Sequence, residues 1–303
     1  MCIRDSVKTA FLNGIIEHDT FISQPEGFID HPNYVCKLKK SLYALKQSAR
    51  CWNQTLNNFL IANGYQRNGA DNCIYVKSEK KIDGFISFVI LAVYVDDIIP
   101  VSNDVNMLKV EKESLCQEFE MTDQGEIHFI LGMSLKRNHT ARTLSINQEK
   151  YLESLLNRFE MEGCKPMPTP LHRRKKFHKR TDEEEQCDQS IYQQAIGCPT
   201  YVSTATRADI TAAVGILSQF MSRPSKDHWT GVKRALRTMS YRLKFSVNGH
   251  EVDLYGFSDA DWAEDTDNRR STSGYVFKVA YSTTGWCSKK QGTVAKSLSL
   301  IHI

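Results

Sequence analysis

The sequence predicts an α+β protein in which helices alternate with β-hairpins. Residues 85–101 contain two apolar runs of strand length, rich in β-branched and aromatic side chains, a composition typical of paired strands. Residues 47–62 and 147–163 instead carry apolar side chains at helical spacing. Because these patterns do not follow a regular strand–helix–strand repeat, we do not expect a doubly wound parallel sheet.

The composition is that of a globular protein with room for two domains. Of 303 residues, 41% are hydrophobic and 24% charged, and the formal net charge of +4 weakly favours anionic partners. No apolar run reaches the roughly 20 residues of a membrane span, so we expect no membrane partner. The nine cysteines are scattered and never form a Cys-x-x-Cys pair. This argues against a disulfide framework or zinc site and indicates an intracellular protein that is not secreted.

The most informative stretch joins its two apolar runs through Asp96 and Asp97. The simplest local structure is a β-hairpin with these two residues at its bend. Carboxylates beside so much apolar surface are costly unless they are compensated, and a divalent cation suits paired oxygen ligands best. The pattern therefore indicates metal-assisted phosphate chemistry. The alternative is a solvated Asp-Asp turn between two buried strands.

Before this stretch, the sequence predicts little regular structure until one amphipathic helix. Residues 7–13 form a short strand or turn, and 15–32 are mostly loop because they contain prolines and a glycine. The helix spans 47–62 and ends at Asn63-Gly64. Four lysines precede or begin it, at positions 37, 39, 40 and 46. They form either a solvated face or a contact surface for phosphates.

After the central stretch, the pattern predicts two more helices with a strand region between them. Asn103 or Asp104 caps the first helix. Residues 121–135 are expected to form a second hairpin-like region broken by two glycines. Asn147 then opens a strong helix that Gly163 ends.

The clearest boundary in the chain is 165–188, where prolines are followed by a basic run and then by an acidic run. We interpret it as an exposed linker, since the acids can screen the bases; a nuclear-import or nucleic-acid patch is the alternative. Asp209 is expected to cap the next helix. Beyond the linker we expect two helices and three strands, over residues 209–221, 227–240, 252–257, 275–280 and around Trp286.

Tyr94-Val95-Asp96-Asp97 resembles the Tyr-x-Asp-Asp box of reverse transcriptases, and its surroundings resemble the Pol polyprotein of copia-type LTR retrotransposons. Similar boxes follow the family order at 7–14, 24–28, 39–50 (where the family has Gly at position 44), 119–123, 131–133 and 164–166. Residues 258–262, 269–275 and 288–291 resemble the family's RNase H region. So many boxes in one order make the resemblance specific, and it covers the chain from 7 to about 297.

The resemblance implies a polymerase palm and thumb, with the fingers missing, followed by a truncated RNase H-like domain. The implied divisions are a non-native junction (1–6), reverse transcriptase palm and thumb (7–164), a charged linker (165–190), a helical connection (191–250) and the RNase H-like domain (251–303).

The resemblance also implies RNA-directed DNA synthesis, in which a primer 3′-hydroxyl attacks the α-phosphate of a dNTP with the help of two Mg²⁺ (or Mn²⁺) ions. The implied catalytic metal ligands are Asp96 and Asp97 for the polymerase and Asp259, with Asp261 nearby, for RNase H. The implied nucleotide-binding residues are Phe11, Tyr94, Gln47 and Lys46, and the implied nucleic-acid contacts are Lys39, Lys40 and Arg50. The implied partners are an RNA or DNA template with primer, dNTPs and other parts of the same polyprotein, in a cytoplasmic particle or the nucleus. Without the resemblance, Phe11 would be a core aromatic and Asp259–Asp261 a solvated strand-end cluster.

Three features depart from the family pattern. Ser6 stands where the family has its first catalytic Asp, and Asp5 is expected to point to the other face of a strand. The fingers region is absent, and 298–303 replace a Glu-containing box. We therefore predict that this chain is inactive, or nearly so, in both activities. The alternative to a polymerase fragment is a catalytically dead remnant that at most binds nucleic acid.

Overall fold

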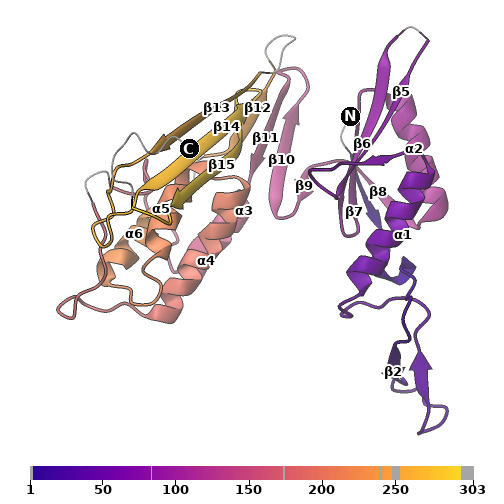
Figure 1. Cartoon of the computed structure of the whole chain (residues 1–303), viewed down its shortest axis with the longest axis horizontal. Coiled ribbons are helices and arrows are strands. Elements are labelled where there is room, and N and C mark those ends of the chain that lie inside the picture. Colours follow the sequence, from indigo (N-terminus) through magenta and orange to yellow (C-terminus); the bar gives the residue numbers. More distant parts are fainter. Residues whose placement is uncertain (1–2, 83, 173–174, 239–240, 248–252, 295–303) are drawn as a thin grey trace. The chain divides into compact units, whose positions relative to one another are not determined.

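The computed structural model describes residues 3–82, 84–172, 175–238, 241–247 and 253–294. It divides the chain into two compact units, an N-terminal unit (1–127) and a C-terminal unit (128–303). Each combines helices with antiparallel sheets (Figure 1), so the predicted α+β class is confirmed. None of the described helices has both the length and the apolar character needed to cross a membrane. Arg173, Arg174, the start of the strand expected at 252 and the tail 298–303 lie outside the described residues.

A six-stranded antiparallel sheet forms the centre of the N-terminal unit, in the order β4-β5-β6-β7-β1-β8. Its strands are β1 (Ile3–Val7), β4 (Gln66–Arg67), β5 (Ile74–Lys80), β6 (Ile86–Tyr94), β7 (Asp97–Ser102) and β8 (Met121–Glu126). Burial alternates along β6, where Val89 and Leu91 are buried, because successive side chains of a strand point to opposite faces. The sheet therefore has one strongly apolar face.

Two helices complete the core on that face. Trp52, Leu56 and Leu60 of α1 (Ser48–Ala62) are buried at every fourth position and join one apolar cluster with the sheet and with α2 (Val105–Glu118). Asp104 caps α2 by accepting hydrogen bonds from the backbone amides of two first-turn residues. Gly64, with φ +84°, follows α1. Both predicted helices and their end signals are thus confirmed.

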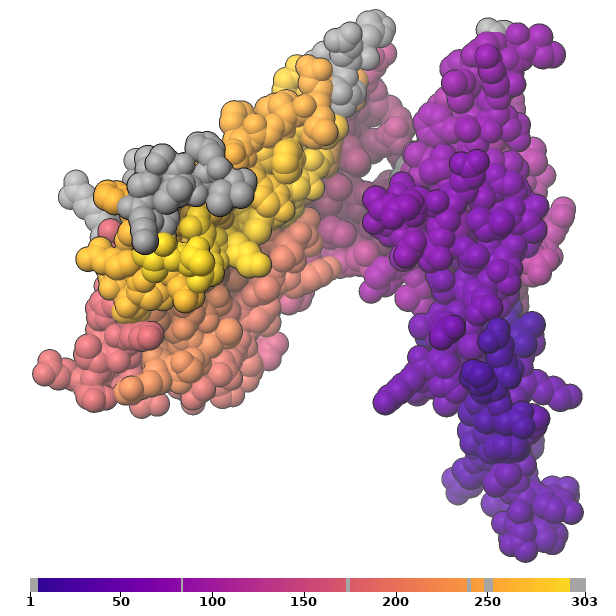
Figure 2. All heavy atoms as spheres, viewed as in Figure 1, coloured from indigo at the N-terminus to yellow at the C-terminus, as the bar shows by residue number. Residues whose placement is uncertain are grey.

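A separate two-stranded hairpin, β2 (Phe21–Ser23) and β3 (Val35–Lys37), projects from the rest of the N-terminal unit (Figures 1 and 2). The short 3₁₀ helix η1 (Ala10–Asn13) precedes it. As predicted, residues 15–32 are mostly without regular structure. Phe28, in the loop between the two strands, is 81% exposed. The β2–β3 hairpin therefore contributes little to the core.

The described residues of the C-terminal unit form two antiparallel sheets. One has the order β12-β11-β10-β9 and the other β13-β14-β15. The strands are β9 (Phe129–Ile130), β10 (Met133–Asn138), β11 (Thr143–Asn147), β12 (Leu243–Ser246), β13 (Leu254–Ala260), β14 (Thr272–Val279) and β15 (Ser282–Lys290). The last three correspond to the three strands expected near the end of the chain.

Four helices supply most of the apolar core of this unit: α3 (Glu149–Arg158), α4 (Gln189–Ala205), α5 (Ala208–Ser218) and α6 (Lys226–Leu236). Arg207, not Asp209, is the N-cap of α5. The two side chains instead form a bidentate ion pair, with both N–O distances 2.7 Å, and Arg207 is 1% exposed. The predicted cap at Asp209 is therefore wrong, because its carboxylate neutralises this buried guanidinium.

Two further expectations need correction. Residues 121–135 are hairpin-like only in their second part: β9 pairs with the start of β10 across Gly132, whereas β8 pairs with β1 in another sheet. The segment 165–188 has no helix or strand among its described residues, but it is not simply exposed. Phe177 packs into the helical core, because burial of an aromatic ring outweighs the solvation of its charged neighbours.

Candidate active site at the Asp96–Asp97 hairpin

The paired carboxylates lie where β6 turns into β7. Tyr94 pairs with Asp97, so the connecting turn consists of Val95 and Asp96, and Asp97 is the first residue of β7. The predicted hairpin is confirmed, with its bend one residue earlier than expected. Val95 adopts φ +56°, a left-handed conformation that is uncommon for a β-branched residue. Such a turn persists only when its surroundings hold it in place.

Contacts from two other elements hold this turn. The indole Nε1–H of Trp52 on α1 donates to the Val95 carbonyl oxygen at 2.6 Å. The backbone amide of Val7 at the end of β1 donates to the Asp96 carbonyl oxygen at 2.8 Å. Trp52 is itself fixed by an edge-to-face contact with Phe119, with ring centroids 5.2 Å apart. Both turn carbonyls are therefore anchored to the core.

β1 brings a third side chain to the two acids. Ser6 pairs with Asp97 across β1 and β7, and its hydroxyl donates to Asp96 Oδ2 at 3.4 Å. Ser6 thus lies beside the paired carboxylates, although it is 90 residues away from Asp96 in sequence. Sequence reasoning could name this position but not its distance from Asp96.

Asp5 points away from this group, as predicted. It is only 3% exposed, and its carboxylate lies 3.3 Å from Lys112 Nζ on α2. Burial raises the pKa of Asp5, although the neighbouring Lys112 opposes that rise. Because adjacent residues of a strand face opposite sides of the sheet, the charge of Asp5 is directed away from Ser6 and Asp96.

The donors at the turn fit a hard divalent cation, although incompletely. Asp96 and Asp97 supply carboxylate oxygens, and Ser6 supplies a neutral hydroxyl oxygen. Mg²⁺ is commonly held by one or two carboxylates together with water and substrate phosphates. Within the described ranges, no cluster of three or more His, Cys, Asp or Glu side chains suits a metal. Among the described residues, the turn therefore offers two carboxylates and one neutral hydroxyl as oxygen donors.

The residues expected to meet a nucleotide lie in neighbouring elements of the same unit. Phe11 on η1 contacts Tyr43 with ring centroids 4.8 Å apart and is only partly buried. Gly14 permits this segment to pack on α1, since an added Cβ would lie 2.9 Å from the backbone nitrogen of Trp52. Tyr94, beside the turn, is 56% exposed.

Gln47 is the N-cap of α1, the helix that carries Trp52, and Arg50 lies in its first turn. Trp52 lies five positions after Gln47, a rise of about 7.5 Å along the helix. The Gln47 side chain is partly buried and donates to Thr20 Oγ1 at 3.4 Å. The implied cationic contacts, Lys39, Lys40, Lys46 and Arg50, are all exposed.

The second acidic pair lies at the end of β13 in the C-terminal unit. Asp259 is exposed, and its Oδ1 accepts the backbone amide of Ala260 at 2.8 Å. Asp261 accepts the amides of Glu264 at 3.3 Å and Thr272 at 3.0 Å. Both carboxylates thus bind backbone amides, and the Asp261 carboxylate connects its loop to β14.

The family comparison decides the class of the N-terminal unit. The family described as reverse transcriptase (RNA-dependent DNA polymerase) matches residues 2–173. The chain belongs to the reverse transcriptase family. The match includes the hairpin, β1 and α1 and ends before the Asp259–Asp261 pair.

The relatives of this chain confirm its predicted resemblance to copia-type retrotransposon Pol polyproteins. The chain is 39% identical over 300 residues to the retrovirus-related Pol polyprotein from transposon TNT 1-94 of Nicotiana tabacum, covering 96% of the chain and 22% of the relative. It is 38% identical to the Pol polyprotein from transposon RE1 of Arabidopsis thaliana, covering 96% of the chain and 20% of the relative. A transposon Ty5-1 protein of Saccharomyces cerevisiae is 30% identical, with coverage of 94% and 92%. The chain thus spans about a fifth of the two plant polyproteins.

Sequence reasoning missed two features of the site. One is the hydrogen bond from Trp52 to the turn, for which the local pattern gave only a core aromatic. The other is Ala44, whose φ of +72° is the conformation that glycine adopts most readily. The family's glycine at this position was the available signal.

Proposed function

We propose that the chain is a fragment of an RNA-directed DNA polymerase of a copia-type retrotransposon. Its reaction is nucleotidyl transfer from a dNTP to a primer 3′-hydroxyl, and its partners are an RNA or DNA template with primer and other parts of the same polyprotein. The observation that carries the proposal is the convergence of Ser6, Asp96 and Asp97 across β1 and β7. Family membership supports the reaction class.

Asp96 and Asp97 would hold the metal, Mg²⁺ or Mn²⁺. A bound ion of this kind supplies positive charge that activates the primer hydroxyl and neutralises the phosphates. The hairpin orients both carboxylates because its turn carbonyls bind Trp52 and Val7. Such preorganisation limits the reorganisation needed during reaction.

The remaining roles follow the elements around the turn. Phe11, supported by Tyr43, would exclude a ribose 2′-hydroxyl by its bulk. Gln47, Lys46 and Tyr94 would contact the incoming nucleotide. Lys39, Lys40 and Arg50 would bind phosphates of the primer–template, since exposed cations dominate sequence-independent affinity.

Ser6 limits the metal affinity expected of this chain. Its hydroxyl lies next to Asp96 but provides no charge for a metal, so we expect weak metal binding and little or no primer extension. The test is Mn²⁺ binding, measured by electron paramagnetic resonance, on the wild type, Ser6→Asp and the double variant with Asp96→Asn. Ser6→Asp should bind Mn²⁺ at least about tenfold more tightly, a gain of about 1.4 kcal/mol, and Asp96→Asn should reverse it.

Primer extension completes the test. The wild-type chain should not extend a primer above the Asp96→Asn background with Mg²⁺. Extension clearly above that background would contradict the predicted inactivity. Failure of Ser6→Asp to gain Mn²⁺ affinity would contradict the proposed metal site.

Ser6 also favours a second candidate, a remnant that binds nucleic acid without catalysis. Such binding should depend on salt and lysines, not on metal. Replacing Lys39 and Lys40 with Gln should then reduce the slope of log affinity against log salt by up to about 2, since each duplex phosphate that a lysine neutralises adds about 0.9 to that slope. Asp96→Asn should leave binding unchanged in EDTA. A metal requirement for binding would exclude this candidate.

We infer that 251–303 carry the start of an RNase H-like domain. The antiparallel order β13-β14-β15 and the position of Asp259 near the end of β13 support the proposal. Asp259 would be the first metal ligand, with Asp261 as a nearby ligand. Because Asp261 accepts the amides of two residues beyond β13, whereas Asp259 accepts only that of its neighbour Ala260 among the hydrogen bonds between described residues, Asp261→Asn should destabilise this loop more than Asp259→Asn. Equal effects in thermal unfolding would contradict this division of roles.

A further inference from the structure

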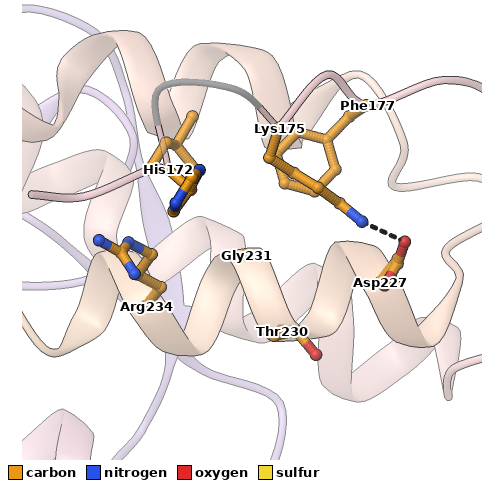
Figure 3. Close-up of a pocket in the computed structure, with 8 residues that line it drawn as sticks. His172, Lys175, Phe177, Asp227, Thr230, Gly231 and Arg234 are labelled. Carbon is orange, nitrogen blue, oxygen red and sulfur yellow. Dashed lines mark hydrogen bonds and ion pairs between the residues drawn. The ribbon is translucent and has the colours of Figure 1, made fainter.

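A pocket in the C-terminal unit lies between the segment after α3 and helix α6. Its cavity volume is about 330 Å³, and both of its walls belong to described residues. Leu171, His172, Lys175 and Phe177 line one wall; Asp227, Thr230, Gly231 and Arg234 of α6 line the other (Figure 3). It is distinct from the hairpin that bears Asp96 and Asp97, which belongs to the N-terminal unit.

The wall after α3 is packed closely onto α6. A Cβ at Gly231 would lie 2.8 Å from the Phe177 ring, so only glycine permits this contact. Phe177 also lies 5.7 Å from the His228 ring, between centroids. Phe177 and Leu171 are only partly buried and pack against the core cluster. The pocket therefore has an apolar wall with an aromatic ring held in place.

The charged side chains lie toward the two ends of the pocket. Figure 3 shows His172 and Arg234 near one end and the Lys175–Asp227 ion pair near the other. Thr169 fixes the guanidinium of Arg234 by accepting from Nε at its carbonyl (3.1 Å) and from Nη2 at its hydroxyl (2.8 Å). Among the hydrogen bonds between described residues, Thr169 takes two of the five N–H donors of Arg234.

The dimensions and charges select the class of ligand. The Phe177 ring lies against Gly231, three residues before Arg234 on α6, a rise of about 4.5 Å along the axis, so one small ligand can reach both the ring and the guanidinium. The volume lies at the lower end of small-molecule sites. Arg234 and Lys175 outnumber the single carboxylate of Asp227, so the lining favours an anion. A guanidinium fork suits a phosphate, and an aromatic wall suits a base.

We propose that this pocket binds one nucleotide, with its phosphate at the His172–Arg234 end and its base against Phe177. The nucleotide is either free or the phosphorylated end of a nucleic-acid strand. This site is independent of the proposed polymerase centre and needs no metal.

The test is calorimetric titration of the whole chain with deoxyadenosine 5′-monophosphate in EDTA. Saturable binding is expected, and deoxyadenosine should bind at least about tenfold more weakly because it lacks the phosphate. Arg234→Gln should weaken nucleotide binding at least about tenfold. Lys233→Gln removes the same charge from the adjacent position, which contacts Trp229 outside the pocket, and should change affinity less than about twofold.

Asp227→Asn guards against a folding artefact, because it is expected to tighten binding, whereas Arg234→Gln is expected to weaken it. Removing the carboxylate that pairs with Lys175 should tighten binding of inorganic phosphate about threefold. A 5′-phosphorylated tetranucleotide that binds more tightly than the mononucleotide would identify a strand end; the reverse would identify a free nucleotide. The proposal is overturned by absence of saturable binding, by equal losses in Arg234→Gln and Lys233→Gln, or by loss of binding in Asp96→Asn.

Discussion

Replacing Ser6 with Asp should destabilise the metal-free protein and make its stability depend on a divalent metal. Ser6 Oγ lies 3.4 Å from Asp96 Oδ2, so the new carboxylate would stand about 4 Å from an existing one. Two like charges at that distance repel by about 4 kcal/mol at an effective dielectric constant of 20 and by about 1 kcal/mol in water. Because both side chains are partly exposed, we expect the free energy of unfolding to fall by about 1–3 kcal/mol.

Metal should reverse this loss. At a Mg²⁺ concentration 100 times its dissociation constant, binding to the folded state alone restores about 2.7 kcal/mol. The assay is urea unfolding in EDTA and in Mg²⁺, together with hydrogen exchange of the Val7 amide, which donates to the Asp96 carbonyl. Exchange at Val7 locates the effect at the turn.

Ser6→Asn is the matched control, since it adds similar volume without charge. It should show neither the loss in EDTA nor the recovery in Mg²⁺. The reasoning is refuted if Ser6→Asp is as stable as the wild type in EDTA and insensitive to Mg²⁺, or if Ser6→Asn responds to Mg²⁺ equally.

Three other predictions follow from contacts described above. Trp52→Phe removes the indole donor from the Val95 carbonyl and should lower the free energy of unfolding by about 2–4 kcal/mol, from the unpaired acceptor and the lost volume, as measured in urea. Ala44→Gly should raise the free energy of unfolding by about 0.5–1 kcal/mol, because alanine at φ +72° is strained. Burial lowers the pKa of His228 below 6.5, so the folded protein favours the neutral imidazole. The contribution of His228 to the free energy of unfolding is therefore complete above pH 6.5 and is lost as the pH falls further. His228→Gln, which can keep the capping box with Ser225, should reduce that dependence in unfolding measured against pH.

Each of these has its own control. Trp286→Phe removes a similar bond, to the Ser203 carbonyl at 2.7 Å in the C-terminal unit, and should leave exchange at the turn unchanged. If Trp52→Phe leaves Val7 exchange unchanged, the anchoring role is wrong. A loss of stability in Ala44→Gly would show that backbone strain at this position is outweighed by the greater freedom of glycine in the unfolded chain. An unchanged pH slope in His228→Gln would show that other groups cause it.

Local sequence patterns predicted the elements whose structure depends on residues within one short segment. The β6–β7 hairpin, α1 with Gly64 and α2 with its Asp104 cap all follow from periodicity and end signals a few residues long. The helix expected from Asn147 to Gly163 is α3, but it ends at Arg158. The motif around Asp96 also led to the correct family, because its boxes occur in the expected order.

Partners distant in sequence were not predictable from local patterns. β8 carries strand-like residues shortly before β9, yet it pairs with β1 in the sheet of the N-terminal unit, whereas β9 belongs to the C-terminal unit. A strand's pattern states which face is buried but not which edge it joins. Likewise Phe177 lies in a strongly charged stretch, and only tertiary contacts, such as those of Phe177 with Gly231 and of Thr169 with Arg234, show that the segment packs onto α6.

The sequence by itself determined the family and singled out the acidic pair and Ser6. Only the tertiary structure showed that Ser6 contacts Asp96, that Asp5 faces Lys112 and that Trp52 holds the Val95 turn. The reason is physical: residue type and spacing are local properties, whereas these contacts join segments far apart in the chain and depend on how the sheet and its two helices close around one core.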